Sequence, residues 1–572
     1  PPTYGGAPGP SGTGCSGGWC RRYSAVPAVR RHRGWWIAAA YAVVVAGITA
    51  AWWARPGYVW LLDSVWGPRP PLTPEAPTSQ LPWQLITTGL THILSGPVAE
   101  KLTLSLVLWA IPVGMYYLAR RFMDHGWAAV SGLLYVLNPF VYERLLSGQW
   151  IVLAGYAFLP VVLAWLADAL RAGGRRAWGR LATGLAVYPW VSPHFAYLAV
   201  GLVGLLGAGY VAAERPAWWR PGWRLVGYGA AAAAGWLAVN AFWLRPGASE
   251  LQPPFGPEDF TAFRTAADPV LGVWANVLGL YGFWQGGLNL QPKVYVGAGW
   301  WLISVVILGL ALGGLVWLVR RRRWLGVLVG VGLVVVVILA VGDAVPWTRA
   351  VTLWLADRLP GYRGLRETGK LIGLLALAYA LLAPLGARWL AGWWQQRWAP
   401  RVAMAIVAVL GVVSVTGIWG GYGGQVAVAD YPAGWAQVRQ RLDAAPQARA
   451  VVLPWHGYLR VNFAGGFVAQ PAPVYFGRSV TVAHTFDNLL LDRAPGTMDG
   501  LMLELTTGQI TADQWVEAMR ARGYYYAIML KTDDWQSYAE ALRPARLSVA
   551  YDDADITLYR LLPSQNIAAR SE

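Results

Sequence analysis

Apolar runs of about 17 to 22 residues recur from Trp35 to about Gly421, and runs of this length can cross the hydrocarbon core of a bilayer. Each run has to be helical there, because its backbone amides and carbonyls find no water to bond. The composition agrees, since 56% of the 572 residues are hydrophobic and only 13% are charged. The sequence therefore predicts an α-helical polytopic membrane protein with about eleven spans. They are expected at roughly 35–54, 102–119, 127–141, 151–170, 180–192, 194–213, 225–244, 299–319, 324–342, 371–387 and 402–420.

The formal net charge is +17, but the distribution of the arginines argues against nucleic acid as a partner. They cluster in alternate loops, as the positive-inside rule expects of cytoplasmic loops. The N-terminus is therefore predicted to be cytoplasmic, and an odd number of spans places the C-terminus outside the cell membrane. Of the 29 Asp and Glu residues, only three then face the cytoplasm, so chemistry that needs carboxylates is expected outside. The clusters are Arg30, Arg31 and Arg33; Arg120 and Arg121; Arg171, Arg175, Arg176 and Arg180; Arg215, Arg220 and Arg224; Arg320 to Arg323; and Arg388, Arg397 and Arg401; the three acids are Asp124, Asp168 and Glu214.

The two ends of the chain differ in composition from the transmembrane domain predicted at 35–421. Residues 1–34 are rich in Pro, Gly and Ser and predict a disordered cytoplasmic tail. The only cysteines, Cys15 and Cys20, lie in that tail, so no disulfide or thiolate metal site is expected outside. Residues 422–572 predict a small extracytoplasmic α/β domain. Its strands are expected at 449–453, 474–484 and 524–530, its helices at 511–522 and 535–542, and a hairpin at 547–562; His456 and His484 are its weak candidates for substrate contact.

Asp63 is the first acidic residue of the chain and follows the first span directly, at the start of a long external loop over 55–101. Charge near hydrocarbon is costly to keep, so a carboxylate in this place is a candidate for function. From Gln80 onward apolar residues recur at helical spacing and predict an amphipathic helix on the membrane surface. Such a helix would roof a cavity, or would simply pack on the neighbouring spans.

Two further external connections carry polar candidates. Pro139 is expected to end the third span and to expose Glu143, Arg144 and Gln149 at the outer boundary. His194 begins a span at the same depth as Asp63. It is a candidate for substrate binding, with helix capping or packing as the alternative.

A cationic segment precedes the tenth span. Arg363, Arg366 and Lys370 are spaced three and four apart, so a helix starting here would present all three on one side. Positive charge on the outer side runs against the topology rule, and a phosphate at headgroup level is a natural ligand for it. The alternatives are contact with lipid headgroups or pairing with Glu367. Arg245, in an earlier external loop, is a further cation for the same role.

No strong enzyme signature is present, neither a phosphate-cradling Gly-rich loop nor paired metal-binding histidines. Soluble nucleotides are scarce outside a cell, so a group transfer there needs a donor delivered through the lipid, such as a sugar on a polyprenyl phosphate. This reaction needs a carboxylate base, cations for the departing phosphate and aromatic faces for sugar rings. The chain offers Asp63 for the first role, Arg366, Lys370, Arg363 or Arg245 for the second, and Trp66, Trp83 and Trp150 for the third, with a place in the membrane aromatic belt as the alternative for the tryptophans.

The layout, with a long first external loop opening on an Asp, about eleven spans and a C-terminal external domain, resembles the GT-C superfamily of membrane glycosyltransferases. The segment from Asn138-Pro139-Phe140 to Gln149-Trp150, followed by residues 155–160, is similar to mycobacterial cell-wall arabinofuranosyltransferases. The segment from Arg363 to Lys370 is similar to one in bacterial membrane proteins linked to lipoteichoic acid glycosylation.

The resemblance implies that Asp63 acts as catalytic base or metal ligand. Many members carry two acids close together in that loop, whereas the nearest companions of Asp63 are Glu75 and Glu100. Glu258 and Asp259, in a later loop, are weak candidates to hold a divalent metal, Mg²⁺ or Mn²⁺.

The chain is therefore expected to be a multi-pass enzyme of the cell membrane. It would transfer a sugar, hexosyl or pentosyl, from a polyprenyl-phosphate donor to an extracytoplasmic glycan, lipid or protein, in contact with membrane lipids. The alternatives are a lipid-linked sugar flippase or transporter, and a non-catalytic GT-C-like scaffold in cell-envelope assembly. Few ionisable residues near mid-membrane and no evident inverted repeat argue against a transporter. The enzyme interpretation requires Asp63, Arg366 and Lys370 to lie around a single cavity at the outer boundary.

Overall fold

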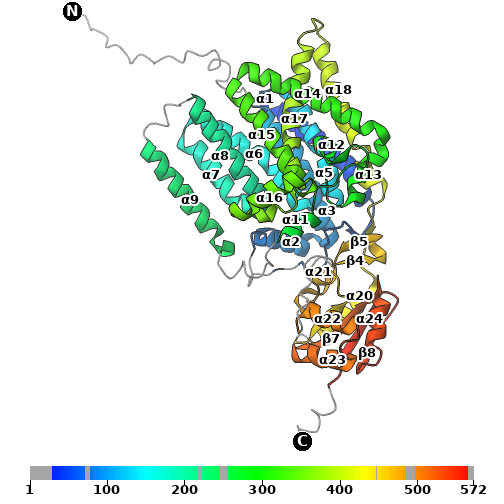
Figure 1. The fold of residues 1–572 in the computed structure, drawn as a ribbon. Coiled ribbons are helices and arrows are strands. Elements are labelled where there is room, and N and C mark those ends of the chain that lie inside the picture. The colour runs from blue at the N-terminus through cyan, green and yellow to red at the C-terminus, as the bar shows by residue number, and fades with distance from the viewer. Residues whose placement is uncertain are drawn as a thin grey trace, which may run out of the picture.

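The structure is a computed structural model that describes residues 29–70, 72, 78–214, 222–244, 256–445, 447–483 and 496–563. Its long helices form one bundle, and a smaller domain that contains most of the strands lies at one end of that bundle (Figure 1). Of the predicted tail, residues 1–28 lie outside the described residues, and the first helix, α1, begins at Val29.

Each predicted span coincides with a helix. Seven of the described helices are long and apolar enough to cross a membrane, and a pair bent by 62°, Ala399–Ser414 with Thr416–Gly423, is a further candidate. The protein is thus a multi-pass helical protein, while eleven as the number of spans stays a prediction. The helices at the predicted spans are α1 (Val29–Trp53), α3 (Gly96–Ala119), α4 (His125–Val136), α6 (Trp150–Ala172), α7 (Arg175–Val191), α8 (Pro193–Glu214), α9 (Gly222–Leu244), α14 (Trp300–Arg321), α15 (Arg323–Val341), α17 (Ile372–Ala391) and α18 (Ala399–Ser414).

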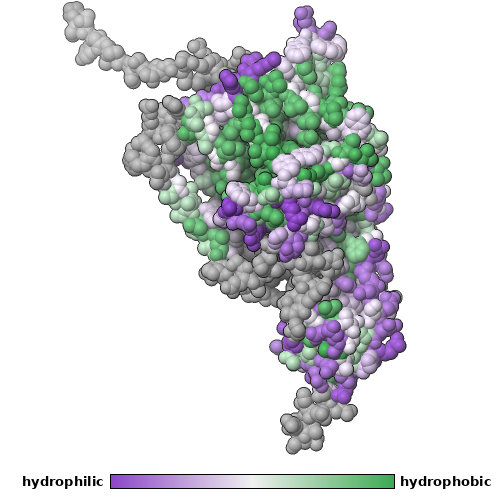
Figure 2. Space-filling model, viewed as in Figure 1, coloured by the Kyte–Doolittle hydropathy of each residue, from purple (hydrophilic) through white to green (hydrophobic). Residues whose placement is uncertain are grey.

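Hydropathy separates the two parts of the molecule. Apolar side chains form a broad band over the helices, whereas the C-terminal domain is largely hydrophilic (Figure 2). The band includes exposed valines and leucines of α14 and α15, such as Val305, Leu312, Val331 and Val334. An apolar surface of this extent is costly in water and suited to lipid.

The helix that follows the cationic segment, α17, is packed deep in the bundle. A Cβ atom on Gly386 would collide with the Leu310 carbonyl of α14, and one on Gly314 would collide with the Leu382 carbonyl of α17. Small residues therefore let the two backbones touch, as is common between membrane helices. This contact fixes the position of α17 and of the residues just before it.

Shorter helices connect the long ones. The amphipathic helix predicted after Gln80 is present as α2, and its Leu85, Ile86 and Ile93 are exposed while Thr87 and Thr91 are buried. These three apolar side chains thus face away from the bundle, which suits a helix at a membrane surface, whereas Trp83 and Leu90 of the same helix pack inward. The other short helices are α5 (Pro139–Leu146), α11 (Pro257–Ala262), α12 (Gly272–Leu278), α13 (Gly286–Val296), α16 (Pro346–Arg358) and α19 (Trp419–Gly423), and α2 spans Leu81–Leu94.

The C-terminal domain contains a mixed five-stranded sheet in the order β6-β3-β7-β9-β8. β3 runs parallel to β6 and β7, and β9 runs antiparallel to β7 and β8. The predicted strands at 449–453 and 524–530, the two helices and the hairpin are present. The strand predicted at 474–484 is wrong over most of its length, because Pro471 and Pro473 begin a short helix there and only Val480–Thr481 pair as β6. The elements are α20 (Ala433–Asp443), β3 (Arg449–Leu453), β4 (Tyr458–Val461), β5 (Gly466–Ala469), α21 (Ala472–Phe476), β6 (Val480–Thr481), α22 (Met498–Thr506), α23 (Ala512–Ala521), β7 (Tyr524–Leu530), α24 (Trp535–Leu542), β8 (Leu547–Asp552) and β9 (Ile556–Leu561).

The first loop is fastened to this domain. β1 (Tyr58–Val59) pairs antiparallel with β2 (Val428–Ala429). Farther along, both nitrogens at the tip of Arg69 donate to the carboxylate of Asp443 at 2.7 Å. The chain segment that carries Asp63 is therefore held between the bundle and the C-terminal domain.

Candidate functional site

Asp63 lies where three distant segments meet. Its backbone nitrogen donates to the carbonyl of Ser147, just after α5, at 2.8 Å. The carbonyl of the preceding residue, Leu62, accepts from the backbone nitrogen of Ala469 in β5 at 2.7 Å. The backbone on both sides of the carboxylate is thus fixed before any side chain is considered.

Each carboxylate oxygen of Asp63 accepts a hydrogen bond from a neutral donor. Gln149 Nε2 donates to Oδ2 at 3.0 Å, and the Tyr458 hydroxyl donates to Oδ1 at 2.9 Å. Within the described part of the chain, no Lys or Arg forms an ion pair with it. Burial raises the pKa of Asp63, and the two hydrogen bonds oppose that rise. A carboxylate with a raised pKa takes up a proton more readily than an ordinary surface acid, which suits a general base.

From Asp63 a continuous series of polar contacts runs to His194. Gln149 accepts from Arg144 Nη1 at 2.6 Å, Arg144 pairs with Glu367, Glu367 Oε2 lies 3.2 Å from Lys370 Nζ, and Lys370 Nζ lies 3.2 Å from His194 Nε2. We call these six residues, Asp63, Gln149, Arg144, Glu367, Lys370 and His194, the Asp63 network.

The amide of Gln149 can be oriented in only one way. Arg144 is purely a donor and therefore requires the amide oxygen, which leaves the amide nitrogen for the carboxylate of Asp63. One neutral side chain thus separates the acid from the guanidinium of Arg144.

The cations of the network are buried with a single counter-charge between them. Arg144 is 1% exposed and Glu367 is 5% exposed. Burial by itself would raise the pKa of Glu367, but the charges of Arg144 and Lys370 outweigh it and lower this pKa to about 2. Glu367 is therefore ionised at any physiological pH. The pairing of Lys370 with Glu367, an alternative that the sequence left open, is present.

The exposure predicted for Glu143 and Arg144 is wrong. Glu143 is buried and accepts from the backbone nitrogens of Gly282 and Phe283, at 3.4 and 3.1 Å, so it holds the connection between α12 and α13. Burial is the main reason that its pKa rises to about 8. Both residues lie on α5, which is covered by that connection rather than by solvent.

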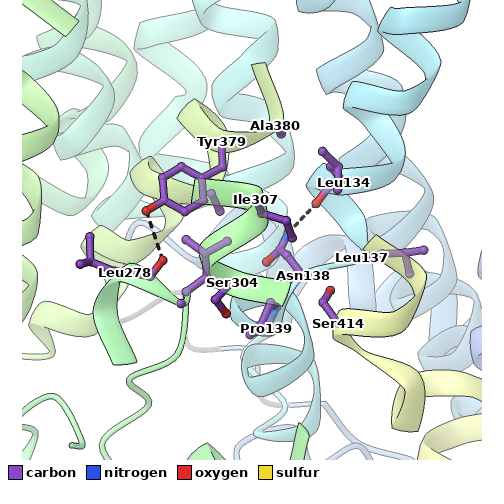
Figure 3. Close-up of a pocket in the computed structure, with 13 residues that line it drawn as sticks. Leu134, Leu137, Asn138, Pro139, Leu278, Ser304, Ile307, Tyr379, Ala380 and Ser414 are labelled. Atoms are coloured by element: carbon purple, nitrogen blue, oxygen red, sulfur yellow. Dashed lines mark hydrogen bonds between the residues drawn. The ribbon is translucent and has the colours of Figure 1, made fainter. Parts of the chain in front are cut away.

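Asn138 sets the position of α5. Its side-chain oxygen caps α5 by accepting from Val141 N at 3.1 Å, while its nitrogen donates to the carbonyls of Leu134 and Tyr135 at the end of α4. Asn138 also lines a small, largely apolar cavity with Leu278 and Tyr379 (Figure 3). The Asp63 network does not line this cavity.

The cationic segment does not form the predicted helix. Residues Tyr362–Leu365 and Thr368–Leu371 form two 3₁₀ turns instead, and the three cations contact different partners. Arg363 is exposed and pairs with Asp357 at 3.2 Å, away from the network. Arg366 is half-buried with its guanidinium 5.0 Å from the centre of the Phe263 ring. The charge of Glu367 acts on Arg366, and that of Lys370 acts on Asp63, so these groups share one neighbourhood.

The residues near Asp63 do not fit a divalent metal as they are arranged. No three His, Cys, Asp or Glu side chains of the described residues gather as a metal site requires. Glu258 is exposed, and Asp259 uses one oxygen to cap α11 by accepting from Gly256 N at 2.6 Å. Of the nearest acids in the first loop, Glu100 accepts from Val59 N at 2.8 Å; Glu75 lies outside the described residues, as does Arg245.

Aromatic side chains adjoin the network. The Trp150 ring centre lies 5.1 Å from that of Trp83 and 6.2 Å from that of Trp66, and Trp150 follows Gln149 directly. The three tryptophans proposed for sugar binding therefore form one cluster. His456, by contrast, pairs with Asp534 at 2.9 Å in the C-terminal domain, and His484 lies outside the described residues.

Comparison with known proteins finds similar architectures only among solved structures. No family model and no curated protein matches the chain. Among solved structures, arabinofuranosyltransferase AftD from Mycobacteria matches with a TM-score of 0.59 and 17% identity, over 95% of this chain and 40% of AftD. The chain shares its fold with these structures, which are GT-C glycosyltransferases. A mutant form of AftD matches with a TM-score of 0.55 and 16% identity, over 95% of this chain and 42% of the mutant.

The resemblance to GT-C glycosyltransferases predicted from the sequence is thereby confirmed at the level of the fold. This chain spans less than half the length of AftD. ArnT from Cupriavidus metallidurans also matches, over 93% of this chain and 98% of ArnT, at 14% identity and a TM-score of 0.49, a value too low to support an argument. The sequence singled out Asp63 as a candidate but gave no sign of its partner Tyr458, which follows it by 395 positions. No local pattern in the sequence connects the two residues.

Proposed function

We propose that this chain is a membrane glycosyltransferase that moves a sugar from a polyprenyl-phosphate donor to an acceptor hydroxyl on the outer face of the cell membrane. The observation that supports this most strongly is the Asp63 network. In it, a half-buried carboxylate without a counter-ion of its own among the described residues lies one amide away from a buried group of cations. The acceptor is a glycan, lipid or protein of the cell envelope.

In the proposed reaction, Asp63 takes the proton of the acceptor hydroxyl while the acceptor oxygen bonds to the anomeric carbon of the sugar. The bond from that carbon to the phosphate oxygen breaks, and its electron pair leaves with the polyprenyl phosphate. Lys370, Arg366 and Arg144 would stabilise this phosphate. The ring of the sugar would rest against Trp150 and its two neighbours.

In the proposed reaction the net charge of the site becomes more positive as negative charge develops on the departing phosphate. Arg144, Arg366 and Lys370 against Asp63 and Glu367 give three positive and two negative charges, a net charge of +1. When Asp63 accepts the proton, the net charge becomes +2 as the phosphate gains negative charge. Proton uptake by the base thus favours departure of the phosphate. The donor set around Asp63 does not fit a metal, so no step is assigned to one.

The class of reaction is tested by reconstituting the full chain in lipid vesicles with radiolabelled polyprenyl-phosphate arabinose, and separately with hexose donors. The acceptor is a polysaccharide fraction from the envelope of cells that lack the gene. We expect label to move from the lipid extract to the polysaccharide. Label that crosses the bilayer but stays on lipid would identify a flippase. Donor binding without transfer or movement, with every donor and acceptor offered, would favour the scaffold.

A further inference from the structure

We propose that Tyr458, from the C-terminal domain, positions the Asp63 carboxylate for proton transfer, so that this domain completes the site. The inference rests on the function proposed above. Tyr458 is a positioning residue here, because it touches the base and not the reacting atoms.

The geometry around the carboxylate supports this role. The hydroxyl of Tyr458 holds Oδ1 at 2.9 Å while the amide of Gln149 holds Oδ2 at 3.0 Å. Two donors on different oxygens fix the plane of the carboxylate as well as its place. Each oxygen has a second lone pair, so the carboxylate can still accept the proton of a substrate hydroxyl.

The hairpin that carries Tyr458 is itself anchored to the backbone next to Asp63. Tyr458 in β4 pairs with Ala469 in β5, and Ala469 N donates to the carbonyl of Leu62 at 2.7 Å. One rung of the hairpin therefore holds both the side chain of Asp63 and the backbone that precedes it. At the far side, Arg460 N donates to Asp533 Oδ2 at 2.7 Å, which ties the hairpin to the loop after β7.

The hydrogen bond from Tyr458 also selects the charged form of Asp63. Burial and the neighbouring Asp63 charge raise the pKa of the Tyr458 phenol, so it remains a donor at every working pH. A bond donated to a carboxylate favours ionisation and lowers its pKa. The other charges that act on Asp63 are Glu367, which raises its pKa, and Lys370, which lowers it; neither is changed by a substitution at Tyr458.

The test compares Tyr458→Phe with Tyr431→Phe in the reconstituted full chain. The hydroxyl of Tyr431 donates to the Trp66 carbonyl at 2.8 Å, so it joins the C-terminal domain to the same loop without touching Asp63. For Tyr458→Phe we expect the acid limb of the pH profile of kcat/KM to move up by about 1 pH unit, as loss of one bond to a charged group implies. For Tyr431→Phe we expect no movement of the limb.

A second variant keeps the shape of the side chain. Replacing Tyr458 with 3-fluorotyrosine makes the phenol a stronger donor, so the limb should move down. An unmoved limb in Tyr458→Phe, or an equal movement in Tyr431→Phe, would overturn the positioning role while leaving Asp63 as base. Full activity of folded Asp63→Asn would instead overturn the proposed function itself.

Discussion

Two groups of charged side chains, the ion pair of Asp268 with Lys293 and the Asp63 network, differ in how their carboxylates are paired. Asp268 and Lys293 form an ion pair at 2.7 Å, each 7% exposed, and the ammonium lies 4.0 Å from the centre of the Trp300 ring. Asp268 also accepts from the backbone nitrogens of Val270 and Leu271. Burial opposes ionisation of Asp268, but Lys293 and these amides outweigh it and lower its pKa.

In this pair, which we call the Asp268 pair, one negative and one positive charge neutralise each other. The Asp63 network instead ends in a carboxylate that neutral donors hold and that burial makes easier to protonate. This difference distinguishes a structural ion pair from a candidate catalytic site. In the structural ion pair the two charges neutralise each other, whereas in the candidate site one carboxylate remains able to exchange a proton.

The largest expected effect comes from breaking the network at its centre. Glu367→Gln leaves Arg144 and Lys370 buried without their counter-charge, so we expect a loss of about 3–5 kcal/mol in the free energy of unfolding at pH 7. The folded-state pKa of Glu367, about 2, lies below its ordinary 4.5. The stabilisation is therefore complete above pH 4.5 and is lost as the pH falls toward 2. Thermal unfolding in detergent at several pH values measures this, with the exposed Glu258→Gln as control.

Breaking the Asp268 pair should have a smaller and purely structural effect. Asp268→Asn leaves Lys293 its contacts with Asn276 and Trp300, so we expect a loss of about 3 kcal/mol in the free energy of unfolding. Transfer per folded molecule and its pH profile should not change. A shifted pH limb in folded Asp268→Asn would mean that the pair belongs to the site.

The smallest effect is expected at Arg363, which lies outside both groups. Its partner Asp357 is exposed, and exposed pairs contribute little. Arg363→Ala should change the free energy of unfolding by no more than about 1 kcal/mol and leave the KM for the donor unchanged. Arg366→Ala is the matched change inside the neighbourhood of the site and should raise that KM. An equal rise in both variants would restore Arg363 as a donor-binding residue.

The sequence predicts the helical positions well, because apolar runs of membrane length have no other stable structure in lipid. It also singles out Asp63, since an acid next to a span is conspicuous without knowledge of its partners. What it misses depends on contacts between distant residues. Arg144 and Glu367 are 223 positions apart, and only the folded bundle brings them together.

The errors at the cationic segment have a local cause. A spacing of three and four places cations on one side only if the segment is an α-helix, but Gly361 adopts a left-handed conformation with φ of 80° and 3₁₀ turns follow. Side chains of a 3₁₀ turn repeat every three residues rather than 3.6. The spacing therefore predicted the wrong local geometry for this segment.

The most direct test of the account is the transfer rate of folded Asp63→Asn with a polyprenyl-phosphate sugar donor. Because desolvation makes the half-buried carboxylate of Asp63 costly to ionise, the neutral amide should leave the unfolding temperature unchanged or higher. We predict a transfer rate lower by about 100-fold or more, as loss of a general base implies. A folded variant that retains a rate within about threefold of the native chain would contradict Asp63 as the base.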